Sequence, residues 1–399
     1  MRFSKACALF APAVASVHSV VGWGVVGHQI VATIAEIFLT ANSRSAISTI
    51  LPPETNGHLA PIAAWADRVK NPSTAPLHFA NGVGDWPPSQ CSFGTNGWTD
   101  PQRNVFVGIL NNTLGITEYE GVERDHALRY LVHFVGDLHQ PLHIVGRDRG
   151  GNGDRVRWNR KITNLHSVWD NSLISNAILS ITNYTDPLPS QQIESVLTGA
   201  IYDPYVRFII SEGILQWWKD ETHHWASCPP TSSFDGLLGP NQSPRDLFNI
   251  NGDESLEDAV DPQTRFAQKL SSDSFSLPLS PSSSPELPAC PLDWAKPIHA
   301  LNCNLRSPRS SPTTLIWPKF LDIPPHDGPP ERVPAGELVE LDTPGYAGKV
   351  RSSLLVEKLL ATAGWRLAAI LNELLDPHGS GVDGSAKGLM TEPRVWVRN

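Results

Sequence analysis

The chain has 399 residues, a formal net charge of −9 and a hydrophobic fraction of 40%, with 35 prolines and 30 glycines. This length suits one large domain or two small ones with a sizeable core. After the N-terminal stretch the sequence contains no run of about eighteen apolar residues, so we expect no transmembrane helix. An acidic protein does not attract nucleic acid over long distances, so a polyanionic substrate would have to be held by local cations.

Residues 1–22 are typical of a secretory signal peptide. The basic start MRFSK precedes the apolar stretch ACALFAPAVASV, and the small residues VVG follow. We expect cleavage between Gly22 and Trp23, which makes Trp23 the mature N-terminus and the protein secreted and extracellular. The alternative is a buried N-terminal helix.

The cysteines agree with secretion. Cys7 leaves with the signal peptide, and an even number remains: Cys91, Cys228, Cys290 and Cys303. An even count suits an oxidising compartment, but four cysteines allow three pairings and their spacing does not choose among them. Glycosylation sequons, which are compatible with secretion, occur at Asn111, Asn183 and Asn241.

Four stretches show apolar residues at helical spacing. In chain order they are residues 28–39, 126–140, 205–225 and 350–375. In each of them, apolar residues recur every three or four positions and form one stripe. No strand alternation is sustained and no internal repeat is found, so the sequence predicts an all-α fold.

Two proline-rich stretches interrupt this pattern, at about residues 229–289 and 304–345. Neither has helical periodicity or enough apolar residues to pack alone, which predicts loops or disordered insertions. The last helix must return to the bundle, because its apolar stripe needs a partner. We therefore expect one domain over residues 23–375 and a C-terminal tail over residues 376–399.

The stretch HFVGDLHQPLH, residues 133–143, carries the first indication of a metal site. On a helix, His133 and Asp137 lie four positions apart on one face, so they can share an ion. Pro141 ends or bends the helix just before it, which lets His143 point toward a second ion.

The same spacing recurs in HSVWD, as His166 and Asp170. One such pair is weak evidence in a chain with 14 histidines, whereas two pairs with a histidine between them are much stronger. His139 lies on a different helix face from His133, and we do not expect it to be a ligand.

Three further candidates lie upstream: His28, Asp67 and His78. Each taken alone is more simply a helix-terminal, surface or core residue, but with the two pairs they form a set of histidines and aspartates without cysteine. Nitrogen and oxygen ligands favour zinc in a hydrolytic role over a closed structural site. Eight side chains are too many for one ion, so two or three zinc ions would fit, as in the metal clusters that cleave phosphate esters.

In order and spacing, WGVVGH, WADRV, PLHF, HFVGDLHQPLH, GGN and NLHSVWD resemble the motifs of the S1/P1 family of zinc-dependent secreted nucleases. WAKPIHALNC and AGWRLAAILNELL extend the resemblance, which covers roughly residues 23–228 and 290–375. It implies a single, mainly α-helical domain of the phospholipase C/P1 nuclease type with three zinc ions. It also implies an endonuclease that acts on single-stranded DNA and RNA and leaves 5′-phosphates, with 3′-nucleotidase activity left open.

The resemblance implies which residues hold each ion. The first zinc would be held by Asp67, His78, His133 and Asp137. The second would be held by His143, His166 and Asp170. The third would be held by His28, Asp137 and the free amino group and carbonyl of Trp23. An uncut precursor would then lack the third ion and be inactive.

The resemblance also implies roles for residues near the metals. Asp67 and Asp137 would be catalytic through the ions, and Lys70, which stands where the family usually has an arginine, would stabilise the transition state. Phe79 would stack on a base of an unpaired strand, unless it is a core phenylalanine. Asn81 stands where the family commonly has an aspartate that contacts the base edge, so base preference would differ.

Disulfides Cys91–Cys303 and Cys228–Cys290 are the pairing that the resemblance favours. Substrates would be single-stranded nucleic acids and nucleotides, and we expect a monomer without a membrane anchor.

Two alternative functions stay open. One is a zinc-dependent phospholipase C, which would need an apolar approach to a membrane. The other is a non-catalytic secreted zinc-binding protein whose proline-rich stretches bind a partner.

Overall fold

The computed structural model describes residues 23–69, 71–188, 193–194, 197–229, 288–303, 315–318 and 334–377. The predicted signal peptide, most of both proline-rich stretches and all but the start of the C-terminal tail lie outside these described residues. Lys70 and the sequon at Asn241 lie outside them as well.

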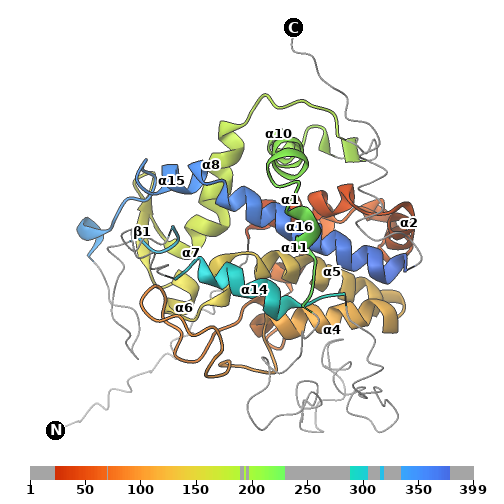
Figure 1. Ribbon diagram of the computed structural model, residues 1–399, viewed down its shortest axis with the longest axis horizontal. Coiled ribbons are helices and arrows are strands. Elements are labelled where there is room, and N and C mark those ends of the chain that lie inside the picture. The colour runs from red at the N-terminus through yellow and green to blue at the C-terminus, as the bar shows by residue number, and fades with distance from the viewer. Residues whose placement is uncertain are drawn as a thin grey trace, which may run out of the picture.

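Helices make up most of the described structure, which confirms the predicted all-α class (Figure 1). The longer helices are α1 (Val25–Ile37), α2 (Ala41–Ile50), α4 (Val105–Glu118), α5 (Gly121–Leu138), α14 (Pro291–Ala300) and α16 (Leu355–Leu375). The shorter helices are α3 (Trp65–Arg68), α6 (Asp148–Gly151), α7 (Leu165–Ser167), α8 (Leu173–Ser180), α10 (Asp203–Phe208), α11 (Thr222–Trp225) and α15 (Ala347–Ser352). Single 3₁₀ turns are η1 (Pro53–Thr55), η2 (Ala60–Ile62), η3 (Ala75–His78), η4 (Pro141–Ile144) and η9 (Ala335–Glu337), and η5 (Val168–Ser172) and η6 (Ile209–Trp217) are π-helical.

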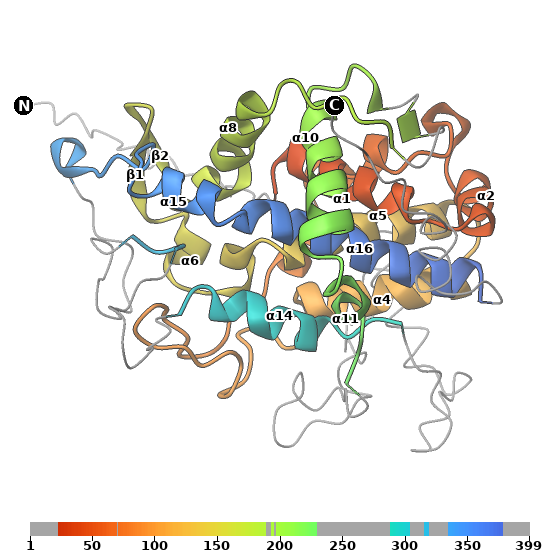
Figure 2. The ribbon, with the colours of Figure 1, turned by 45° about the horizontal axis from the view of Figure 1, so that its top comes forward.

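The core lies where α1, α4, α5 and α16 meet. The helix α16 crosses the molecule in both ribbon views, and it packs against α1 and α5 (Figure 2). On α5 the predicted stripe is buried, with Leu128, Leu131 and Val135 fully enclosed. This shell of apolar helices surrounds the polar side chains that α1 and α5 also carry, which is how a charged cluster comes to lie inside the protein.

Two of the predicted helices are interrupted. Residues 205–225 form most of α10, then the π-helical η6 and α11, instead of one regular helix. Residues 350–375 divide into the end of α15 and the whole of α16, because Leu354 adopts a left-handed conformation with φ 52°. Apolar periodicity therefore located these segments but not their breaks.

A short hairpin was not predicted from the sequence. Strands β1 (Arg155–Trp158) and β2 (Lys161–Asn164) pair antiparallel, and Asn159 and Arg160 form the turn with positive φ at both positions. The Glu340 carboxylate accepts hydrogen bonds from the backbone N–H groups of both turn residues, at 3.0 and 2.8 Å. Part of the second proline-rich stretch is thus docked on the body of the protein.

Both disulfides have the pairing that the resemblance implied, Cys91–Cys303 and Cys228–Cys290. The second one joins the two ends of the first proline-rich stretch, with a sequence separation of 62 residues, which lowers the entropy of the unfolded chain.

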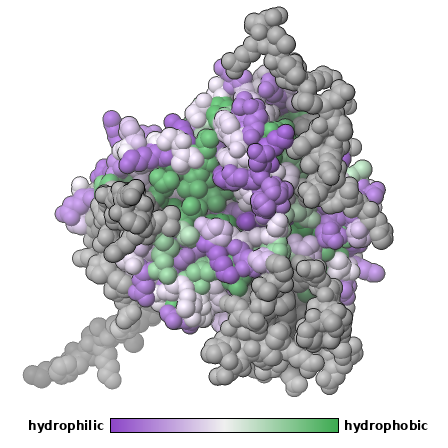
Figure 3. Space-filling model, viewed as in Figure 1, coloured by the Kyte–Doolittle hydropathy of each residue, from purple (hydrophilic) through white to green (hydrophobic). Residues whose placement is uncertain are grey.

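The exposure of the side chains bears on the predicted glycosylation sites and on the predicted lack of a membrane anchor. Asn111 lies inside α4 with 7% of its surface exposed, so that sequon is a poor glycan acceptor, whereas Asn183 is exposed in a loop. On the face shown in Figure 3, hydrophobic residues lie in a band beside hydrophilic ones. No described helix is long and apolar enough to span a membrane.

Candidate metal centre

Four elements bring the upstream candidates together with the first H-x3-D pair. His28 comes from α1, Asp67 from α3, His78 from η3, and His133 and Asp137 from α5. Two groups result, in each of which the potential ligand atoms lie within 4.8 Å of one another: Asp67, His78 and His133, and His28, His133 and Asp137. His133 therefore belongs to both groups, and all five side chains face one buried point.

Asp137 links the two groups through its two carboxylate oxygens. Its Oδ2 lies 3.0 Å from His78 Nδ1 and 3.3 Å from His133 Nε2, and its Oδ1 lies 3.4 Å from His28 Nε2. Asp67 Oδ1 lies 3.2 Å from His133 Nε2 on the other side. A single carboxylate at 0% side-chain exposure thus serves both groups.

The position of His28 depends on a glycine. Its ring stacks on that of His133, with centroids 3.8 Å apart and planes 16° from parallel. A Cβ atom at Gly136, on the next turn of α5, would lie 2.6 Å from His28 Nδ1. Only glycine leaves the room that this ring needs.

A third group forms beyond the end of α5. The helix ends at Leu138, as Pro141 predicted, and the turn η4 carries His143 away from the first two groups. His143 meets His166 on α7 and Asp170 on η5, where the potential ligand atoms again lie within 4.8 Å of one another. Asp170 stands in a π-helical turn, a feature that is frequent at functional sites.

The second nitrogen of three histidines is fixed by backbone. Nδ1 of each ring donates to a carbonyl oxygen: His133 to Ala63 at 2.8 Å, His143 to His78 at 2.7 Å, and His166 to Gly150 at 2.6 Å. With the proton on Nδ1, each neutral ring presents the lone pair of Nε2 to the centre. This anchoring of the outer nitrogen is typical of metal-ligating histidines.

Several of the atoms that face the centre have no hydrogen-bond partner in the protein. His143 Nε2 and His166 Nε2 lie 3.2 Å apart, and neither has a proton to donate when Nδ1 carries it. Among the described residues, both carboxylate oxygens of Asp67, Oδ1 of Asp137 and both ring nitrogens of His28 are buried without a hydrogen bond. Buried polar atoms are rarely left unpaired, so the arrangement fits cations that take these lone pairs.

Burial and charge set the protonation of the rings. Burial lowers the pKa of His28 and of His143, so both rings are neutral near pH 7. Burial also acts on His133, but the carboxylates of Asp137 and Asp67 outweigh it and raise its pKa to about 9. In the absence of a metal, a proton on His133 offsets the negative charge of these carboxylates. A bound metal cation would take the place of that proton.

Trp23 lies two residues before α1 begins at Val25, and it is fully buried. The backbone N–H of Gly24 donates to the carbonyl oxygen of Asp170 at 2.9 Å. The residue after the expected mature N-terminus is therefore tied through its backbone to the group of His143, His166 and Asp170, while the role of Trp23 as a ligand stays a prediction.

The proposed substrate-binding residues follow directly after His78. Phe79 and Asn81 are half-buried, so each still has a surface that a ligand can contact. Their backbone carbonyls accept hydrogen bonds from Val105 N–H and Thr99 N–H, which holds this segment against the start of α4. Their roles, and that of Lys70, stay predictions.

Gln140 is a residue of the centre that the sequence did not reveal. It is fully buried; its Nε2 donates to Asp170 Oδ1 at 2.6 Å, and its Oε1 accepts from Leu142 N–H at 2.7 Å. It thereby orients a candidate ligand and starts the turn that carries His143. The only sequence signal was its place before Pro141.

His139 is buried outside the three groups, as expected. Its Nδ1 donates to Val135 O at 2.7 Å, and its Nε2 accepts from Arg366 at 2.8 Å. This side chain joins α5 to α16 and has no free nitrogen for a metal.

Comparison with known proteins places this chain in a family. The family model described as S1/P1 Nuclease matches residues 23–231, just over half of the chain. The chain is 32% identical over 227 residues to Endonuclease 4 of Arabidopsis thaliana, covering 52% of this chain and 68% of that protein. It is 35% identical over 161 residues to Nuclease S1 of Aspergillus oryzae, covering 39% and 56%. It is 34% identical over 154 residues to Nuclease P1 of Penicillium citrinum, covering 37% and 57%. The matched region contains every candidate ligand, and the chain belongs to the S1/P1 nuclease family.

Proposed function

We propose that this chain is a secreted, zinc-dependent nuclease that cleaves single-stranded DNA and RNA and leaves 5′-phosphates. The observation that carries the proposal is the set of three adjoining groups of buried histidine and aspartate side chains. Their donors are nitrogen and oxygen only, which suits zinc in a hydrolytic site. The names of the relatives, which are nucleases and endonucleases, support nucleic acid as the substrate.

The residues present fit three ions. One would be held by Asp67, His78, His133 and Asp137, one by His143, His166 and Asp170, and one by His28, Asp137 and the terminal amine and carbonyl of Trp23. Bound zinc would supply Lewis-acid chemistry, lowering the pKa of water and neutralising charge on the phosphate.

The ligands differ in how far they are enclosed, and this indicates where a phosphate would enter. Asp67 has 9% of its side chain exposed and His78 has 6%, whereas His28, His133 and Asp137 have none. The scissile phosphate would therefore approach from the side of Asp67 and His78. The buried carboxylate of Asp137 would hold the inner end of the cluster in place.

The segment after His78 would bind the nucleotide. Phe79 is half-buried next to this more open end, and an aromatic face there would stack on a base. Bases are free to stack in unpaired strands, which favours a single-stranded substrate. Asn81 presents both a donor and an acceptor to a base edge. Lys70 would place a positive charge near the phosphate.

Secretion forms part of the same proposal. Two disulfides suit an oxidising compartment, and cleavage of residues 1–22 would free the amine of Trp23. The domain would span residues 23–375, with the proline-rich stretches as insertions and residues 376–399 as a tail.

The test is hydrolysis of single-stranded DNA by the processed protein, with and without a chelator. Chelator-sensitive cleavage that leaves 5′-phosphates, and its loss in Asp137→Asn, would support the proposal. A zinc-loaded protein that leaves DNA and RNA intact would refute it, and phosphatidylcholine would then be tried as a substrate. Retention of fold in the variant is checked by circular dichroism.

A further inference from the structure

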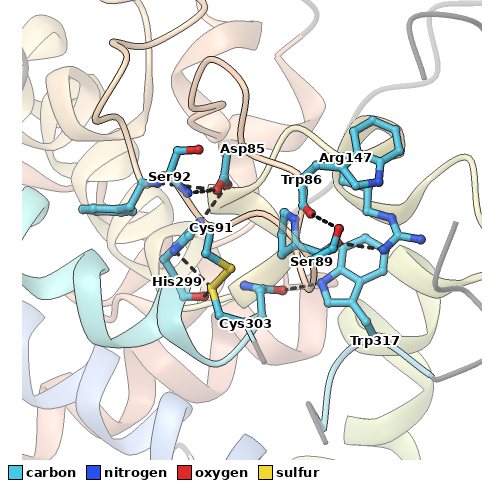
Figure 4. Close-up of a disulfide and its surroundings, with 12 residues drawn as sticks. Asp85, Trp86, Ser89, Cys91, Ser92, Arg147, His299, Cys303 and Trp317 are labelled. Atoms are coloured by element: carbon cyan, nitrogen blue, oxygen red, sulfur yellow. Dashed lines mark hydrogen bonds and ion pairs between the residues drawn. A yellow bond between two sulfur atoms is a disulfide. The ribbon is translucent and has the colours of Figure 1, made fainter. Parts of the chain in front are cut away.

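A second buried pair of an aspartate and a histidine lies outside the metal centre, beside a disulfide. Asp85 comes from the loop between η3 and α4, and His299 from the end of α14. Figure 4 shows the pair next to Cys91–Cys303, which joins the same two segments. Neither residue belongs to the three metal groups. His299 lies in the stretch WAKPIHALNC, but the sequence predicted no role for either residue.

The pair is held in one orientation. Asp85 Oδ2 lies 2.7 Å from His299 Nε2, and Asp85 Oδ1 accepts from the backbone N–H of Ser92 at 2.7 Å. Both side chains are at least nine-tenths buried, with 5% of Asp85 and 3% of His299 exposed. Since Nε2 faces the carboxylate and donates to it, the other nitrogen is left for a different partner.

That partner is a disulfide sulfur. His299 Nδ1 lies 3.8 Å from Cys303 Sγ, one helical turn further along the chain. The order carboxylate, imidazole, sulfur is the one by which an imidazolium stabilises a thiolate, with the carboxylate holding the charged ring.

The two cysteines of this disulfide differ in exposure. Cys91 is exposed, whereas Cys303 is only partly so and adjoins the imidazole. An incoming thiol therefore reaches Cys91, and the sulfur that must leave is the one that His299 stabilises. The rate of exchange rises when the leaving thiol has a low pKa.

We propose that Cys91–Cys303 is a thiol-exchange site for low-molecular-weight thiols of the glutathione class. The attacking thiolate forms a bond to Cys91 Sγ, the Cys91–Cys303 bond breaks, and its electron pair goes to Cys303. The proton released by the attacking thiol reaches Nδ1 of His299, which pairs with the Cys303 thiolate. A second thiolate then bonds to the sulfur of the attached thiol, the bond of that sulfur to Cys91 breaks, and its electron pair goes to Cys91 Sγ, which takes up the proton of the second thiol. Both cysteines are then reduced, and the two small thiols leave joined in their own disulfide.

The exchange is expected to be reversible. The hydrogen bond between Asp85 and His299 joins the same loop and helix as the disulfide does, so it keeps Cys303 near Cys91 after the disulfide is broken. The other disulfide provides a contrast in the same chain. Its Cys290 is buried, and among the described residues that sulfur contacts the carbonyl of Ser227 at 3.8 Å, whereas Cys303 Sγ contacts both the carbonyl of His299 at 3.6 Å and the ring of His299 at 3.8 Å.

The experiment treats the folded, processed protein with reduced glutathione, quenches with acid, alkylates free thiols and maps peptides by mass spectrometry. The expected product carries glutathione on Cys91 and the alkyl group on Cys303. In His299→Asn the rate at this disulfide should fall by at least roughly tenfold, because the leaving thiol loses its stabilising charge. The rate at Cys228–Cys290 should not change, which controls for general loosening.

Asp85→Asn is the second variant, and it tests the proposal in the case that His299→Asn does not fold. It keeps an oxygen for the Ser92 N–H but removes the charge that holds the imidazolium, so exchange should again be slower. Glutathione found mainly on Cys303, or wild-type exchange rates in the folded variants, would overturn the proposal. Because the readout is an adduct and not nuclease activity, the result does not depend on the proposed function.

Discussion

Replacing Gln140 with methionine tests whether this buried amide positions Asp170 for a metal. Methionine has a similar length and no hydrogen-bonding amide. The change leaves Asp170 Oδ1 without its donor at 2.6 Å and Leu142 N–H without its acceptor at 2.7 Å. Loss of such an outer partner typically lowers metal affinity by about 10- to 100-fold, or about 1.4 to 2.7 kcal/mol.

Asn302→Leu is the matched control. Asn302 is also fully buried and also makes two hydrogen bonds, to Pro141 O at 2.9 Å and from Trp317 Nε1 at 3.0 Å. It supports the same turn, η4, but neither of these partners is a candidate ligand. Each variant should lose about 2 to 4 kcal/mol of unfolding free energy, because buried polar groups are left unpaired.

The assay has two readouts for each variant. Urea unfolding in the presence of a chelator measures the stability of the metal-free protein, and competition with a chromogenic chelator measures zinc affinity. We expect similar losses of stability and a loss of affinity at one site in Gln140→Met alone. Equal losses of affinity in both variants would mean that metal binding follows stability, and the positioning argument would be wrong.

Four further outcomes are expected. In Gly136→Ala, the new methyl group would lie 2.6 Å from His28 Nδ1 and displace that ring, so native mass spectrometry should count one ion fewer than in the wild type. A protein that retains residues 1–22 should also bind one ion fewer, because it lacks the terminal amine. Chelation should lower Tm by several degrees in calorimetry, since it leaves buried ligands unpaired. The hydrogen bond that the His58 ring donates to the Glu36 carboxylate raises the pKa of His58 above its usual 6.5, against the opposing effect of burial. The unfolding free energy that His58 contributes, below about 1 kcal/mol for a partly exposed pair, should be present in acid and disappear as pH rises through neutrality, measured as wild type minus His58→Gln.

Local features of the centre were accessible from the sequence. His133 and Asp137 share a face because a helix returns every three to four residues, and the end of α5 before Pro141 follows from the geometry of proline. The disulfide pairing came from family resemblance, since spacing left three connectivities open. What these inferences share is that each depends on residues close in the chain or on a known pattern.

Features that depend on packing between distant segments were not accessible. The stacking of His28 on His133 joins α1 to α5, and the contact of His299 with Asp85 spans 214 positions. Apolar periodicity does not encode such contacts. The π-helical turn at Asp170 was missed for a related reason, because one extra residue in a turn leaves the sequence pattern almost unchanged.

The same packing raises the question of what allows this polar cluster to be buried. Five imidazoles and three carboxylates enclosed by apolar helices oppose folding, since burial disfavours each charge and leaves nitrogen and oxygen atoms without partners. Cations are the groups that would satisfy all of them together, because each ion replaces several missing hydrogen bonds at once. The free energy of metal binding would then form part of the free energy of folding. The disulfides and the helical shell would keep the metal-free chain compact, so that the outer nitrogens of the histidines stay hydrogen-bonded to backbone carbonyls. The site would then be preorganised before metal binding.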